Sequence, residues 1–189
     1  MLNTLTELDA INWILSAIGS DPVTVLEDST DIDVINARRI LKDVSRHIQR
    51  QGWDFNKTTR TYTPDVETHR IMWDDTIITL ASNDGNVYVK RGKYLFNMTG
   101  GTYEFPKPIE VTVIYGVDFD DLPDCFKEYI TAKAAIDFQT RYFGDSSVSP
   151  DLQYALQQAY ADIVQYDMDM VSPNMLNLSG VSEVLQRTT

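Results

Sequence analysis

Cys125 is the first side chain in this sequence that could do chemistry, as a thiolate nucleophile. A nucleophilic thiol needs a base beside it, and the chain has two histidines, His47 and His69. Nothing in their spacing places either one next to Cys125. Because the thiol lies among apolar residues such as Phe126 and Tyr129, we expect it to be a buried small hydrophobe.

Paired carboxylates are the second candidate chemistry. They could supply the acid and base of a glycosidase or the ligands of a divalent cation. The first pair lies in a turn of a strand-rich region, and the second group precedes a helix, where acids complement the helix dipole. We therefore expect structural roles, and a carbohydrate-active hydrolase is the alternative function. The aspartates concerned are Asp74, Asp75, Asp118, Asp120, Asp121 and Asp124.

The sequence contains none of the compact motifs that hold phosphates, nucleophiles or metals. It has no Gly-rich phosphate loop, no G-x-S-x-G, no H-E-x-x-H and no Cys/His metal spacing. Two histidines also leave little for acid-base work near neutral pH. We therefore expect no enzyme, no cofactor and no metal site.

Positive charge is concentrated on one segment, although the formal net charge is -12. The stretch DVINARRILKDVSRHIQRQGWDF at 33–55 holds five of the 16 basic residues. Arg38, Lys42, Arg46 and Arg50 are four apart, and each step advances only about 40° around a helix. They form a basic ridge beside the apolar stripe. A strongly acidic chain is poorly suited to wrapping DNA tightly, so we expect this ridge to contact another subunit.

A matching acidic ridge is predicted on the last helix. Asp151, Asp162 and Asp169 are 11 and 7 residues apart, which returns each to within about 20° of the same face. The two ridges can pair within one subunit or link identical subunits head to tail into a ring. The remaining reading is a pair of solvated faces. These seven residues are the candidate subunit interface.

Four segments have the apolar period of helices. The first opens with Thr4 and Glu7, spaced as a capping box, and ends near Gly19. The second ends near Gly52, and its stripe is Val34, Ala37, Leu41, Val44 and Ile48. Its candidate N-caps are Ser29, Thr30 and Asp31.

The third and fourth helices come late in the chain. The third runs from about Pro123 to Gly144 and is apolar on more than one side, which predicts a central helix. The fourth follows Pro150. We expect the four helices to share one core, in which the buried side chains include Leu41, Val44, Phe126, Ile130, Leu156 and Ile163.

Between the helices, the period changes to that of strands. The segments TRTYT, IITLAS, NVYVK, KYLFN and IEVTVIY are β-branched and aromatic, and the third and fourth predict a hairpin with its turn at 91–93. The fold class is therefore α+β: a four-helix bundle built from both chain ends, with an inserted antiparallel β unit and an extended C-terminal arm. The predicted division is 1–56 and 118–170 for the bundle, 57–117 for the insertion and 171–189 for the arm.

Several stretches resemble the tail tubular protein A family, the head-to-tail adaptors or gatekeepers of short-tailed phages of the autographivirus type. They are NARRILKDVSRHIQRQGWDFN, INWILSAIGSDPVTVLE, LPDCFKEYITAKAAIDFQTRYFG and DMDMVSPNML, and they occur in the family's order. The resemblance covers roughly residues 5 to 176. It is most specific where the second-helix and third-helix motifs occur together.

The resemblance implies a structural function. Family members form a dodecameric ring between the portal and the tubular nozzle, tubular protein B, and DNA passes through the lumen without sequence reading. The expected partners are thus other copies of the chain, the portal, the nozzle and DNA, with no membrane. No signal peptide or bilayer-length apolar stretch is visible. We expect a virion tail protein made in the host cytoplasm, and the hydrolase alternative becomes a tail hydrolase.

Overall fold

The computed structural model describes residues 4–27, 29–143 and 150–171. The fold is α+β, with four α-helices and antiparallel strands. The chain divides into two compact units: one from Met1–Ala37 with Pro123–Thr189, the other from Arg38–Leu122. This boundary falls inside α2 (Ile32–Gln49), so most of that helix belongs with the strands. The division predicted at residues 57 and 117 stays a prediction.

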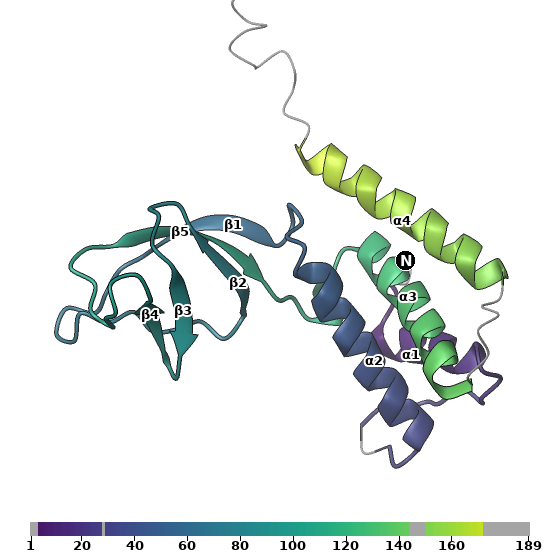
Figure 1. Cartoon of the computed structure of the whole chain (residues 1–189). Coiled ribbons are helices and arrows are strands. Elements are labelled where there is room, and N and C mark those ends of the chain that lie inside the picture. Colours follow the sequence, from purple (N-terminus) through teal and green to yellow (C-terminus); the bar gives the residue numbers. More distant parts are fainter. Residues whose placement is uncertain (1–3, 28, 144–149, 172–189) are drawn as a thin grey trace, which may run out of the picture. The chain divides into compact units, whose positions relative to one another are not determined.

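The first unit contains α1 (Glu7–Ser16), α3 (Asp124–Phe143) and α4 (Pro150–Val171) (Figure 1). Helix α3 packs against both α1 and α4, as its broad apolar surface predicts. Phe126, Ile130 and Phe138 are fully buried on α3. The ring of Phe126 meets Tyr166 of α4 edge-on, with centroids 6.0 Å apart. Two buried phenylalanine rings of α3 thus contribute to the apolar core of this unit, together with aliphatic side chains such as Ile11 and Ile14 of α1.

Two details of this unit differ from the prediction. The capping box is formed by Thr6 and Asp9: Thr6 Oγ1 accepts the Asp9 N–H, and Asp9 Oδ2 accepts the Thr6 N–H. The box predicted at Thr4 and Glu7 is wrong because two Thr-x-x-acid pairs share that spacing, and the helix begins after the second threonine. Leu156 is only half-buried, whereas Ile163, two turns further along α4, is fully buried.

Helix α2 begins after Asp31, one of the three predicted caps. The Asp31 carboxylate accepts the N–H of Asp33 at 2.9 Å, which satisfies one of the free amides at the helix start. The predicted apolar stripe is confirmed, since all five side chains are buried: Val34, Ala37, Leu41, Val44 and Ile48.

The second unit carries the strands, all at positions predicted from the sequence. In the three-stranded sheet, β5 (Ile109–Tyr115) lies between β1 (Lys57–Tyr62) and β2 (Ile77–Ser82), and both pairings are antiparallel. The hairpin of β3 (Tyr88–Arg91) and β4 (Tyr94–Asn97) is also confirmed. Gly92 occupies its turn with a φ of +63°, which favours glycine. The core of this unit includes Ile71, Ile77, Tyr88, Leu95, Phe105, Val111 and Val113.

A buried polar network ties the end of α2 to the end of β5. The Gln49 amide accepts from the Val117 N–H at 2.7 Å and donates to the Val117 carbonyl at 2.9 Å. Asn56 Nδ2 donates to the carbonyls of Gln49 and Tyr115, and its Oδ1 accepts the Trp53 N–H. These bonds use most of the capacity of both buried amides. The motif QGWDFN is therefore a structural joint, which holds the helix against the sheet.

Candidate subunit interface

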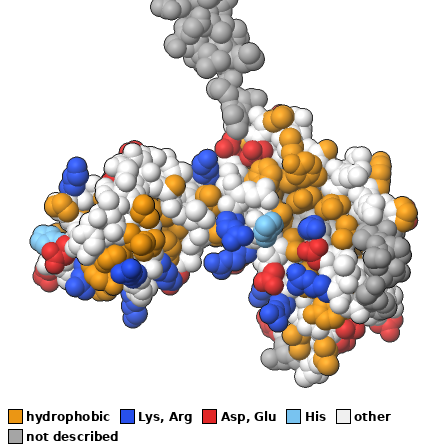
Figure 2. Space-filling model, viewed as in Figure 1, with side chains coloured by type: hydrophobic (Ala, Val, Ile, Leu, Met, Phe, Trp, Pro, Cys, Tyr) orange, Lys and Arg blue, Asp and Glu red, His pale blue; other side chains and the backbone are white. Residues whose placement is uncertain are grey.

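The basic ridge lies on the side of α2 away from its buried stripe. Lys42, Arg46 and Arg50 are exposed, whereas Arg38 is half-buried. Arg50 Nη2 approaches His47 Nδ1 at 3.5 Å. Figure 2 shows Lys and Arg side chains gathered over α2. Three of the four predicted ridge residues are thus available for contact with another molecule.

The acidic ridge lies on α4. Asp151, Asp162 and Asp169 are all exposed, and Asp169 Oδ1 accepts a hydrogen bond from Gln165 Nε2 at 2.8 Å. The sequence of α4 contains no Lys or Arg, so the helix presents negative charge along its described length. The two ridges belong to different compact units, since α4 lies in the first and Arg38–Gln49 in the second.

Cys125 lacks the environment that activates a thiol as a nucleophile. It is half-buried near the start of α3 rather than fully buried as expected. Burial raises the pKa of its thiol, and the negative charges of Glu128 and Asp162 raise it further. The thiol is therefore protonated at neutral pH. His47 and His69 lie in the other compact unit.

Three of the six candidate carboxylates, those of Asp74, Asp75 and Asp124, have structural partners, whereas Asp118 makes no side-chain capping bond. Asp74 Oδ1 accepts from both the backbone N–H and the hydroxyl of Thr76, which closes a turn before β2. Asp75 forms an ion pair with Lys90. Asp124 lies 3.6 Å from Lys127 one turn along α3. In the part of the chain that the structure describes, no three His, Cys, Asp or Glu side chains are grouped so as to hold a metal ion.

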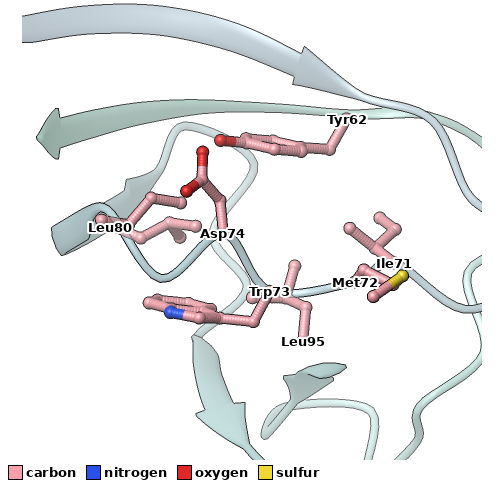
Figure 3. Close-up of a pocket in the computed structure, with 8 residues that line it drawn as sticks. Tyr62, Ile71, Met72, Trp73, Asp74, Leu80 and Leu95 are labelled. Carbon is pink, nitrogen blue, oxygen red and sulfur yellow. The ribbon is translucent and has the colours of Figure 1, made fainter. Parts of the chain in front are cut away.

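One small hollow lies beside Asp74 in the strand-bearing unit (Figure 3). Its walls are aromatic and aliphatic and include Trp73, and Tyr62 and Leu80 lie nearest the carboxylate. The space is about 10 Å³, room for about one water and far less than a sugar ring needs. Burial and the Tyr115 hydroxyl raise the pKa of Tyr62 well above its usual range, which makes its hydroxyl a weak proton donor near neutral pH. This hollow does not support the hydrolase alternative.

The described residues form packed helices, a β unit and charged outer faces. Comparison of the sequence with known protein families identifies the class of protein. The profile described as tail tubular protein matches residues 8–173, so the chain belongs to the tail tubular protein family, whose members are structural proteins of phage tails. The resemblance identified from the sequence is thereby confirmed. Among the described residues, no helix has both the length and the apolar character needed to cross a membrane.

A curated relative gives a more specific comparison than the family match. Tail tubular protein A of Klebsiella phage KP34 is 28% identical to this chain over 121 residues. That alignment covers 64% of this chain and 64% of the relative, which is slightly less than two-thirds of the relative's length.

The sequence reasoning missed a second exposed surface, on the outer side of the β3–β4 hairpin. The sequence contains the pattern of this face, because side chains at every second position of a strand lie on the same side. The residues concerned are Val87, Val89 and Arg91 on one strand and Tyr94, Phe96 and Met98 on the next.

Proposed function

We propose that this tail protein is a ring-forming adaptor, which joins the portal to the tubular nozzle and encloses the channel for DNA. The observation that carries the proposal is the family match over residues 8–173, which spans parts of both compact units. The proposed partners are other copies of the chain in a dodecameric ring, the portal, the nozzle protein B and the passing DNA. The net charge of -12 suits a wall that repels phosphates and leaves the DNA free to move.

The proposed ring subunit is a four-helix bundle built from 1–56 and 118–170, with the β insertion at 57–117. Burial of Val34, Phe126 and Ile163 in the first unit supports an apolar core among its helices. The predicted C-terminal arm, 171–189, lies outside the described residues beyond its first position.

The proposed joint between neighbouring subunits pairs the basic ridge of one copy with the acidic ridge of the next. The exposure of Lys42, Arg46 and Arg50 and of the three aspartates of α4 supports this pairing. Each exposed pair contributes about 0.2 to 1 kcal/mol, too little to affect folding. Repeated at every joint, such pairs fix the register and angle between subunits.

Charge reversal tests the joint. Lys42→Glu with Arg46→Glu should leave the circular dichroism and thermal midpoint of the free chain nearly unchanged, because both side chains are exposed. Ring formation on purified portal, followed by size-exclusion chromatography and electron microscopy, should weaken. Adding Asp162→Lys should restore part of it.

The matched control is Arg60→Glu with Lys107→Glu. Both side chains are exposed in the strand-bearing unit and the change in net charge is the same. If both double variants weaken assembly equally, net repulsion explains the loss and the ridge has no special role. Normal assembly of the Lys42/Arg46 variant at physiological salt would show that the ridge is only a solvated face.

A further inference from the structure

The outer face of the β3–β4 hairpin is apolar where the alternation of a strand would normally place polar groups. The antiparallel register pairs Val89 with Phe96 and Arg91 with Tyr94, so these side chains lie on one face. The Met98 N–H donates to the Val87 carbonyl at 2.7 Å, which extends the same pairing by one step. Tyr88 and Leu95 occupy the opposite face, in the core. The hairpin thus carries apolar side chains on both faces, with Arg91 on the outer face and Lys90 on the inner one.

This outer face is partly open to solvent: Phe96 is buried and Val89 and Tyr94 are half-buried, whereas the residues around them are exposed. Val87 is 55% exposed and Met98 is 51% exposed. Met72 bridges to Tyr94 beside the hairpin and is 69% exposed. In Figure 2, hydrophobic side chains gather over the β3–β4 region with Lys and Arg beside them. We call the surface formed by Met72, Val87, Arg91, Tyr94 and Met98, which lies around the buried ring of Phe96, the outer hairpin face.

Another strand of the same unit shows what a solvated face looks like here. Strand β1 has the sequence KTTRTY, and its residues are exposed up to Tyr62. Its outward side chains are threonines and charged residues, as expected for a strand that faces water. The outer hairpin face instead exposes two methionines and a valine, together with the half-buried ring of Tyr94. Contiguous exposed apolar side chains with polar residues around them are a feature of interaction sites.

Two arginines are held in place on this face by aromatic rings. The Arg91 guanidinium lies 3.9 Å from the centroid of the Phe96 ring. Phe96 meets Tyr103 edge-on at 4.8 Å, and Arg70 lies over both Tyr103 and Tyr94. Stacking on rings orders a guanidinium and leaves its N–H edges free for a carboxylate or phosphate. Less side-chain entropy is then lost when a partner binds.

The composition of the face selects a protein partner over DNA. A phosphate backbone can pair with Arg70 and Arg91, but it offers nothing apolar to cover Met72, Val87 and Met98. Methionine, aromatic residues and arginine together are the groups enriched at protein–protein interfaces. Two arginines among apolar side chains are complementary to carboxylates among apolar side chains.

We propose that the outer hairpin face docks an acidic, partly apolar surface of a different protein of the phage tail. A second copy of the chain also carries exposed acids, but in the proposed ring joint the aspartates of α4 already pair with the basic ridge. The choice of a different protein as the partner therefore rests on the proposed function. The docking itself rests only on the chain being a tail component.

Oxidation of Met72 and Met98 tests the docking in the protein as it occurs in the phage. Hydroxyl-radical footprinting followed by mass spectrometry compares the oxidation rates of the two methionines in three samples. These are intact particles, particles emptied of DNA, and the purified chain alone at a concentration at which it can assemble. Exposed methionine is readily oxidised to the sulfoxide. We expect both methionines to react several-fold more slowly in intact and in emptied particles than in the purified chain. Dissociation of the particles in denaturant should restore the fast reaction.

Three outcomes would overturn the docking proposal. Fast oxidation in intact particles would mean that nothing covers the face. Equal protection in a ring of the purified chain alone would identify a second copy as the occupant. Protection lost on emptying the particle would identify DNA. If the chain forms no ring and binds neither portal nor nozzle, the proposed function fails, whereas protection in whole particles still decides whether the face is covered.

A charge reversal on the face adds a test of the partner's acidity. Particles carrying Arg91→Glu should show faster oxidation of Met72 and Met98 than wild-type particles. The reason is that loss of a central arginine lowers the binding affinity of an interface by roughly tenfold or more. Arg60→Glu is the matched control, since Arg60 also stacks on a tyrosine ring, Tyr115 at 5.5 Å, but on the other sheet. Unchanged protection in the Arg91 variant, with its fold intact by circular dichroism, would contradict an acidic partner.

Discussion

Gly52 offers a sharp test of how α2 is joined to the sheet. It follows the end of α2 with a φ of +80°, in the left-handed region. A Cβ added there would lie 2.7 Å from Ile114 Cδ1 and 3.2 Å from Ile114 Cγ1. Gly52→Ala therefore combines two costs. The left-handed backbone costs an L-residue about 1 to 2 kcal/mol, and the close contact adds the roughly 1 to 3 kcal/mol of an overpacked site.

Gly92→Ala separates these two costs. Gly92 also has a positive φ, +63°, but a Cβ added there meets no atom within 4 Å. It should lose only the backbone part, about 1 to 2 kcal/mol. The two variants should thus differ by about 1 to 3 kcal/mol, or roughly 2 to 4 °C in thermal midpoint for each kcal/mol in a chain of this size. Urea denaturation followed by circular dichroism measures both.

Ile114→Val supplies the third arm, because it removes the Cδ1 atom that the new Cβ would meet at 2.7 Å. In that background, Gly52→Ala should cost less than in the wild type, and a double-mutant cycle should give a nonzero coupling energy. If Gly52→Ala costs no more than Gly92→Ala, or if the cycle shows no coupling, the close packing of Gly52 on Ile114 does not limit the fold and this reasoning is wrong.

Two further predictions concern burial. Phe126→Ala should destabilise the chain by about 3 to 5 kcal/mol, because the ring is fully buried on α3 and truncation leaves a cavity; a loss below about 1 kcal/mol in urea denaturation would contradict that packing. Tyr88 donates to Asp84 Oδ2 at 2.6 Å, and burial with this acceptor raises its pKa to about 12. Because the folded pKa exceeds the unfolded value of about 10, this stability is present below pH 10 and is lost as pH rises toward 12. Stability should therefore fall more steeply for the wild type than for Tyr88→Phe over that range, and equal slopes would refute the assignment.

Helices, strands and the exposed parts of the ridges follow from local pattern. The spacing of Val34, Ala37 and Leu41 places the buried side of α2, and the same period sends Lys42 and Arg46 outward. The hairpin turn at Gly92 is likewise a local signal. These features are predictable because the residues that determine them are neighbours in sequence.

Other features depend on residues far apart in sequence, and prediction failed or was silent there. Strand β5 pairs with both β1 and β2, and nothing local identifies these partners. Arg38 shares the ridge spacing yet is half-buried. The wrong capping box has a local cause instead, because two overlapping Thr-x-x-acid pairs have the same spacing. The outer hairpin face was missed because Lys90 and Arg91 made β3 look amphipathic, and the apolar alternation was not followed across the turn into β4.

The proposed ring joint has a consequence for the two compact units. The basic residues Lys42, Arg46 and Arg50 belong to the strand-bearing unit, whereas the acidic residues of α4 belong to the helical one. Each head-to-tail contact would therefore connect the second unit of one copy to the first unit of its neighbour. A ring closes only if every joint has the same geometry, so closure would constrain how the two units of each copy are oriented. Individually weak ion pairs suit this role, because their value lies in angle and register rather than in stability. In such a ring, the outer hairpin face would be held in one repeated orientation by each copy, as a set of equivalent docking sites requires.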